Sequence, residues 1–83
     1  MHEVRLDASV WNGLDDDAQA LLAEWEVAVG QTVEAGQTLG TAELVKASVA
    51  IAAPAGGRVA ALRVPAGENF SRETVLALVE DGG

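Results

Sequence analysis

Cysteine is absent from this chain of 83 residues, and histidine occurs once, at His2. The absence of cysteine excludes disulfide bonds, thiolate nucleophiles and cysteine-bound zinc. One histidine beside the N-terminus supplies neither a Ser-His-Asp triad nor a multi-histidine metal site. We therefore expect no catalytic residues and no metal ligands in this chain.

Basic residues and long apolar segments are also scarce. Five Lys and Arg stand against 13 Asp and Glu, which gives a net charge of -8. Because phosphate binding needs clustered basic side chains, we expect no nucleic-acid partner. No stretch approaches the roughly 20 apolar residues of a membrane helix, and the N-terminus has no signal-peptide run, so we expect a cytoplasmic protein without a membrane partner.

The residues that are present predict one small all-β domain over residues 1–83. Hydrophobic residues make up 49% of the chain, enough for one core. Apolar residues alternate with polar residues or alanine over 4–10, 24–29 and 47–52, and 75–79 is apolar throughout. A period of two is typical of half-buried strands. Turns are expected at the glycines and prolines between these runs: Gly30, Gly36, Gly40, Pro54, Gly56, Gly57, Pro65 and Gly67.

One segment is ambiguous at this level. Asp15–Asp17 followed by apolar residues at spacings of three and four has the form of a capped helix. The alternative is an acidic loop that leads into a strand near Leu21. An internal repeat favours the strand.

The repeat relates residues 27–43 to residues 64–80 by a shift of 37 positions without a gap. Four pairs are identical: Val27 with Val64, Gly30 with Gly67, Leu39 with Leu76, and Glu43 with Glu80. Two similar units that close on one core predict a flattened barrel or sandwich of two antiparallel sheets with pseudo-twofold symmetry.

Lys46, the only lysine, lies between the two units in a recognisable setting. Glu43 stands three residues before it, Ala47 directly after it, Gly30 sixteen before it and Gly57 eleven after it. The segment from Glu43 to Gly57 resembles the lipoyl domains of 2-oxo acid dehydrogenase complexes, whose centre has the form E-T-D-K-A, then alternating apolar residues, then A-P-x-x-G. The resemblance covers roughly residues 4–80.

The resemblance implies the biotinyl/lipoyl hammerhead fold, with four strands in each sheet and Lys46 at an exposed hairpin tip. It implies that Lys46 is the covalent attachment point of lipoate, and that Gly30, Glu43, Val45, Ala47 and Gly57 are read during modification. The implied function is a non-catalytic carrier domain, freestanding or part of a dihydrolipoamide acyltransferase. Its lipoyl arm would move acyl groups and reducing equivalents in a 2-oxo acid or acetoin dehydrogenase complex.

The implied partners are a lipoate ligase or lipoyl transferase, and the dehydrogenase, acyltransferase and dihydrolipoamide dehydrogenase components. The isolated domain is expected to be a monomer. Composition is consistent with a carrier, because an amine on a flexible stem can hold a mobile arm while the chain supplies no chemistry of its own.

Two positions depart from the lipoyl pattern. The family's Asp before the lysine is Val45 here, and the Thr before it is Leu44. Biotinyl domains place methionines on both sides of the lysine, and Val45 is apolar like one of them, whereas Ala47 matches the lipoyl pattern. Two alternatives therefore stay open: a biotin carrier domain of a carboxylase, and an unmodified lipoyl-like module that binds proteins.

Overall fold

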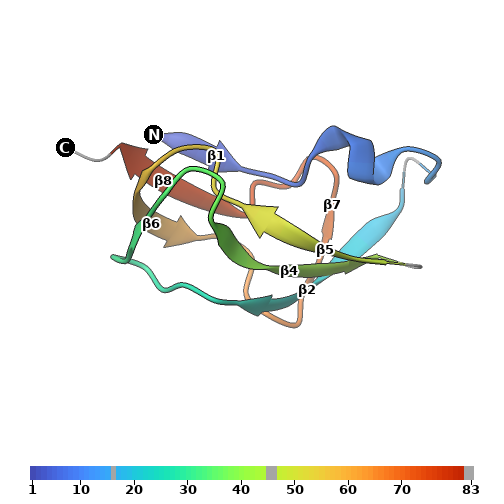
Figure 1. The fold of residues 1–83 in the computed structure, drawn as a ribbon. Helices are drawn as coiled ribbons and strands as arrows, with labels where there is room; N and C mark the ends of the chain where they lie inside the picture. Colours follow the sequence, from blue (N-terminus) through green and yellow to red (C-terminus); the bar gives the residue numbers. More distant parts are fainter. Residues whose placement is uncertain (16, 45–46, 82–83) are drawn as a thin grey trace.

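Two antiparallel sheets form the protein in the computed structural model, which describes residues 1–15, 17–44 and 47–81 (Figure 1). Within these residues each sheet has four strands, so the predicted all-β fold is confirmed. The strands are β1 (His2–Val4), β2 (Gln19–Trp25), β3 (Thr32–Val33), β4 (Thr38–Leu44), β5 (Ala47–Ala52), β6 (Gly57–Leu62), β7 (Asn69–Ser71) and β8 (Ala77–Asp81), and a 3-10 helix, η1, spans Ala8–Trp11.

Successive strands lie in different sheets except for β4 and β5, which pair within one sheet. One sheet has the order β1-β8-β6-β3 and the other the order β5-β4-β2-β7. Their inner faces meet in one apolar core, whose largest fully buried side chains are Val4, Leu22, Leu39, Ile51, Val59, Leu76 and Val79. In the described residues no helix has the length and apolar composition needed to cross a membrane.

The pseudo-twofold relation extends further than the sequence repeat. A shift of 37 residues carries β2, β3 and β4 onto β6, β7 and β8, and the strand orders of the two sheets then correspond. The irregularity between Leu22 and Glu24 in β2 recurs between Val59 and Ala61 in β6. The two halves therefore share backbone geometry even where their side chains differ.

The predicted strand over residues 4–10 is wrong beyond Val4. After β1 the chain turns into η1, because the side chain of Asp7 accepts a hydrogen bond of 2.9 Å from the amide of Ser9. The amide of Val10 then donates to the Asp7 carbonyl at 3.0 Å. The apolar residues of this run reach the core from a helical turn, where Trp11 is buried.

The segment from 15 to 25 enters a strand, as the repeat indicated, and the helix alternative is wrong. The strand is β2, which ends at Trp25, so the alternation over residues 26–29 does not mark a strand. There the amide of Glu26 donates to the Leu39 carbonyl, and the amide of Gln31 closes a turn onto Ala28. The strand predicted over residues 75–79 also has different bounds, because β8 starts at Ala77 and not at Val75.

The glycine turns are only partly as predicted. Gly30, Gly36 and Gly67 have positive φ and lie outside the strands. Gly40 lies inside β4, where an added Cβ would meet the backbone of Glu24 and the ring of Trp25. Gly57 is buried and begins β6. Both glycines are therefore strand residues and not turn residues, and at Gly40 the missing side chain allows close packing.

Candidate site at the β4–β5 connection

The strands β4 and β5 pair along their whole length and bring the residues around the lysine to one end of a sheet. The last pair joins Leu44 to Ala47, and the pair before it joins Glu43 to Ser48. Val45 and Lys46, the predicted attachment residue and its neighbour, lie outside the described residues. In the sequence they are the two residues that link paired positions on adjacent antiparallel strands.

The register of this ladder is fixed by its buried side chains. Ile51 on β5 is fully buried opposite Gly40, and Ala42 on β4 is fully buried opposite Val49. Slipping the pairing by one residue would turn Ile51 to solvent, because successive side chains point to opposite faces. The core therefore determines that two residues separate the paired ends.

The structure brings Glu43 and Ala47 together at this end of the sheet. Glu43 is exposed and lies between Ser48 on β5 and Leu21 on β2, each of which pairs with it. Ala47 is exposed as well. An enzyme that approaches the linking residues would meet the carboxylate of Glu43 and the small side chain of Ala47.

Gly30 and Gly57 lie at the other end of the molecule. Gly57 pairs with Val33 and with Asp81, near the C-terminus. The amide of Gly30 donates to the carbonyl of Val59. Figure 1 shows both termini at the end opposite the paired ends of β4 and β5. The structure does not bring these two glycines together with Glu43 and Ala47.

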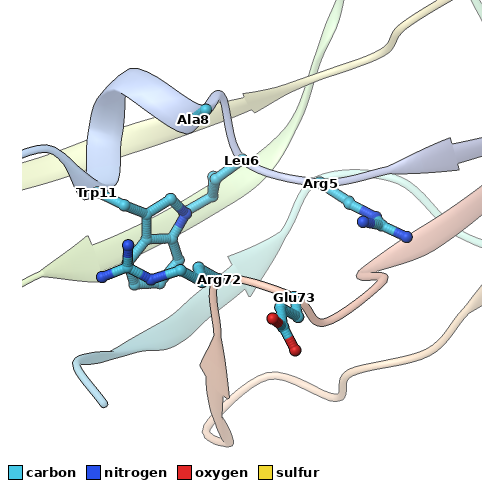
Figure 2. A pocket seen from close by; sticks show the side chains of 6 residues that line it. All are labelled: Arg5, Leu6, Ala8, Trp11, Arg72 and Glu73. Carbon is cyan, nitrogen blue, oxygen red and sulfur yellow. The ribbon is translucent and has the colours of Figure 1, made fainter. Parts of the chain in front are cut away.

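A cavity of about 310 Å³ lies between the segment that follows β1 and the segment that follows β7 (Figure 2). Its lining residues are Arg5, Leu6, Ala8, Trp11, Arg72 and Glu73. Arg5 forms an ion pair with Glu3 at 2.8 Å. This cation is therefore engaged by a neighbouring carboxylate on its own strand segment.

Arg72 joins the two walls of this cavity. Its guanidinium donates to the carbonyls of Asp15, at 2.6 Å, and Leu14, at 3.3 Å, and it lies over the ring of Trp11. Trp11 in turn meets Phe70 edge to face, with ring centroids 6.2 Å apart. These contacts attach the loop after η1 to β7.

Sequence reasoning did not single out Arg72. The residues it contacts are more than fifty positions away in the chain, and no local periodicity links them. A general signal existed: an arginine directly after a short strand in a chain with few cations. That signal does not identify backbone carbonyls as the acceptors.

Comparison with known proteins gave a match to one family model and matches to solved structures. The family model described as biotin-requiring enzyme, for biotin and lipoyl attachment domains, matches residues 15–79. The solution structure of the lipoyl domain of the 2-oxoglutarate dehydrogenase complex from Azotobacter vinelandii superposes with a TM-score of 0.79 and 18% identity, over 100% of both chains. No curated protein sequence matches. At this identity the structural match establishes the fold.

Proposed function

Because this chain belongs to the biotin/lipoyl attachment family, we propose that it is a lipoyl carrier domain modified at Lys46. We take residues 1–83 as a single carrier domain that does not itself catalyse a reaction. The proposed location is the cytoplasm. The two alternatives, a biotin carrier and an unmodified module, predict different adducts on the same lysine.

The pairing of Leu44 with Ala47 is the observation that carries this proposal. It leaves two residues to connect adjacent strands, and one of them is the only lysine of the chain. A two-residue connection at the end of a paired ladder is the kind of position from which a side chain projects away from both sheets. Glu43 and Ala47, which match the lipoyl pattern, flank that connection.

The attachment step uses the amine of Lys46 as a nucleophile. In its neutral form the Nζ atom attacks the carbonyl carbon of an acyl adenylate of lipoate. The amide C–N bond forms, the bond from the acyl carbon to the phosphate oxygen breaks, and AMP leaves. The proton lost from Nζ passes to a base on the ligase or to water. The positive charge of the side chain is thereby removed.

When attached, lipoate supplies a disulfide that accepts electrons and an acyl group. The domain contributes position: it keeps the arm at a high effective concentration near each partner active site. The partners that fit this role are the dehydrogenase, acyltransferase and dihydrolipoamide dehydrogenase components of a 2-oxo acid or acetoin dehydrogenase complex. The similarity of fold to a lipoyl domain of such a complex supports this choice.

Biotin is the second candidate group, because the matched family covers both attachments. The apolar Val45 before the lysine favours it, whereas Ala47 after the lysine favours lipoate. Intact mass separates the two. The chain is coexpressed with a lipoate ligase or with a biotin ligase, and the adduct mass is measured.

A lipoyl-sized gain that disappears in Lys46→Ala is the expected result. Lys46→Arg is the matched control, since it keeps the charge and the long stem but offers no acylatable amine. A mass increase of the size of biotin would instead identify the protein as a biotin carrier domain of a carboxylase. If neither ligase increases the mass, the unmodified protein-binding module is the remaining alternative. A mass increase that persists in Lys46→Ala contradicts Lys46 as the attachment site.

A further inference from the structure

The strand β5 has the longest open edge in the described part of the chain. The strands at the outer edges of the two sheets there are β1, β3, β5 and β7. β5 has six residues, whereas the other three have two or three. The residues of β5 are uncharged, with the sequence ASVAIA. Natural proteins usually shorten or charge an exposed edge, because its unpaired N–H and C=O groups attract other strands.

The direction of these unpaired groups follows from the hydrogen bonds at the end of β5. The amide of Ala53 donates to Gln37, and its carbonyl accepts from Gly36, so both groups of Ala53 face the side of β4. In an antiparallel ladder every second residue faces the same partner. The backbone groups of Ser48, Ala50 and Ala52 therefore point away from β4. Their side chains are small and exposed and leave the edge open.

The pseudo-twofold relation makes β1 the equivalent of β5, and the edge of β1 carries charged side chains. Glu3 on β1 pairs with Leu78, and Ala50 on β5 pairs with Thr41, which is 37 residues before Leu78. The two positions are therefore equivalent in the fold. On β1 the position carries a carboxylate that is bound to Arg5 at 2.8 Å. On β5 it carries a methyl group, so the edge beside the lysine lacks the protection that its symmetric edge has.

The charges near β5 indicate what kind of chain fits this edge. On β5, β4 and β2 the charged residues within the described ranges are Glu43 and Glu24, and both are exposed. The whole chain has a net charge of -8, so electrostatic repulsion opposes pairing with a second copy. A segment that carries Lys or Arg beside small side chains would be attracted.

We propose that β5 is a strand-addition site for the enzyme that acylates Lys46, an inference that rests on the proposed function. An extended, positively charged segment of that enzyme pairs with Ser48, Ala50 and Ala52 and continues the sheet. Because β5 begins one residue after Lys46, the added strand lies about 4.8 Å from the residues next to the lysine. Main-chain pairing thereby fixes the lysine in the register that the enzyme's active site requires.

A proline at the open edge tests this proposal. Ala50→Pro removes an outward N–H and leaves the ladder to β4, a substitution that edge strands tolerate. Glu3→Pro is the matched control, because it makes the same change at the equivalent position of the other edge. We expect kcat/KM for acylation to fall about tenfold in Ala50→Pro, mainly through KM, and to stay within about twofold in Glu3→Pro. Thermal unfolding of both variants reports whether they fold.

Amide exchange on the unaltered chain gives a test that needs no folded variant. The ¹⁵N-labelled protein is mixed with excess ligase in the absence of ATP, so that no acylation occurs. Slower exchange is expected for the amides of Ser48, Ala50 and Ala52, and unchanged exchange for Glu3.

The outcomes separate this inference from the proposed function. If the unaltered chain is acylated while Ala50→Pro reacts as fast as Glu3→Pro, or while the β5 amides exchange at their free rate, the strand-addition site is wrong and the carrier function stands. If neither a lipoate ligase nor a biotin ligase modifies the unaltered chain, both are overturned.

Discussion

Gly30 and Gly67 adopt the same left-handed backbone conformation 37 residues apart, with φ of +94° and +93°. The amide of Gly30 donates to the Val59 carbonyl at 2.8 Å, and the amide of Gly67 donates to the Leu22 carbonyl at 2.7 Å. Leu22 and Val59 are related by the same shift of 37. Each glycine follows a strand of one sheet and bonds to a strand of the other, so the pair closes the sandwich at two equivalent points.

This equivalence predicts how alanine at either glycine affects stability. Gly30→Ala and Gly67→Ala are each expected to lower the free energy of unfolding by about 1–2 kcal/mol, because a Cβ is strained at this φ. No neighbouring atom lies within 4 Å of the added Cβ at either site, so strain and not a clash sets the loss. Chemical denaturation measures it, and losses that differ by more than about 1 kcal/mol would contradict the equivalence.

The same variants test whether Gly30 is read during modification. Gly30 lies at the end with the termini, so we expect the folded Gly30→Ala protein to be acylated at the rate of the unaltered chain. Initial rates by intact mass, below the unfolding temperature, decide this. A specific loss of rate in Gly30→Ala that Gly67→Ala lacks would restore the recognition role that the sequence predicted.

The fold was predictable from sequence because two signals reinforce each other. The period of two located β5 at residues 47–52, and the repeat of 37 residues predicted two equivalent sheets. Strand ends were less predictable. The alternation of residue types continues beyond Val4 and beyond Trp25, although the strands end there and are followed by η1 and by a turn. The hydrogen bonds that form η1 and the turn leave no trace in the hydrophobic pattern of the sequence.

Gly40 shows a second limit of sequence reasoning, and it yields a prediction. The sequence suggested a turn, whereas the structure has a strand residue against the backbone of Glu24 and the ring of Trp25. We expect Gly40→Ala to cost about 2–3 kcal/mol in unfolding free energy, since the neighbouring atoms are backbone and the ring of the partly buried Trp25. Gly56→Ala is the control: the nearest atom to its Cβ is 3.7 Å away, and the expected change is within about 0.5 kcal/mol.

Asp7 makes the stability of the N-terminal segment depend on acid pH. The amide of Ser9 donates to its side chain, and this hydrogen bond, followed by one from the Ser9 side chain, lowers the pKa of Asp7. A lowered pKa in the folded state stabilises the fold above the unfolded value, about pH 4, and this stabilisation is lost as pH falls through the folded value. The acid side of the stability profile therefore includes a contribution from Asp7.

Asp7→Asn keeps an acceptor for the Ser9 amide and removes the titration. We expect its melting temperature to be lower than that of the unaltered chain at pH 7 and to fall less between pH 5 and pH 2. Asp7→Ala, which lacks the acceptor as well, should be less stable than Asp7→Asn at every pH. If the melting temperatures of the unaltered chain and of Asp7→Asn fall equally between pH 5 and pH 2, the hydrogen bond from Ser9 does not favour the ionised form of Asp7, and the prediction is wrong.

For the candidate site, the sequence selected the residues, but only the fold shows which of them lie close together. Spacing alone selected Glu43 and Ala47, and the β4–β5 register places both at one sheet end. Spacing also selected Gly30 and Gly57, which lie at the other end because β4 and β5 each run along the sheet between that end and the lysine. Distance along the chain from Lys46 is thus a poor measure of contact with an enzyme that acts on it.

Val45 gives the sharpest test of why this chain departs from the lipoyl pattern. The pattern has an aspartate directly before the lysine, and Val45→Asp restores it. If a lipoate ligase reads that carboxylate, the initial rate of lipoylation, measured by intact mass, should rise severalfold. Val45→Asn is the control, because it has nearly the same shape without the charge. An equal rise in both variants would assign the effect to turn propensity, which Asp and Asn share. Equal rates in all three chains would show that valine at this position does not impair recognition, and would leave Glu43 as the carboxylate beside the lysine to be tested next.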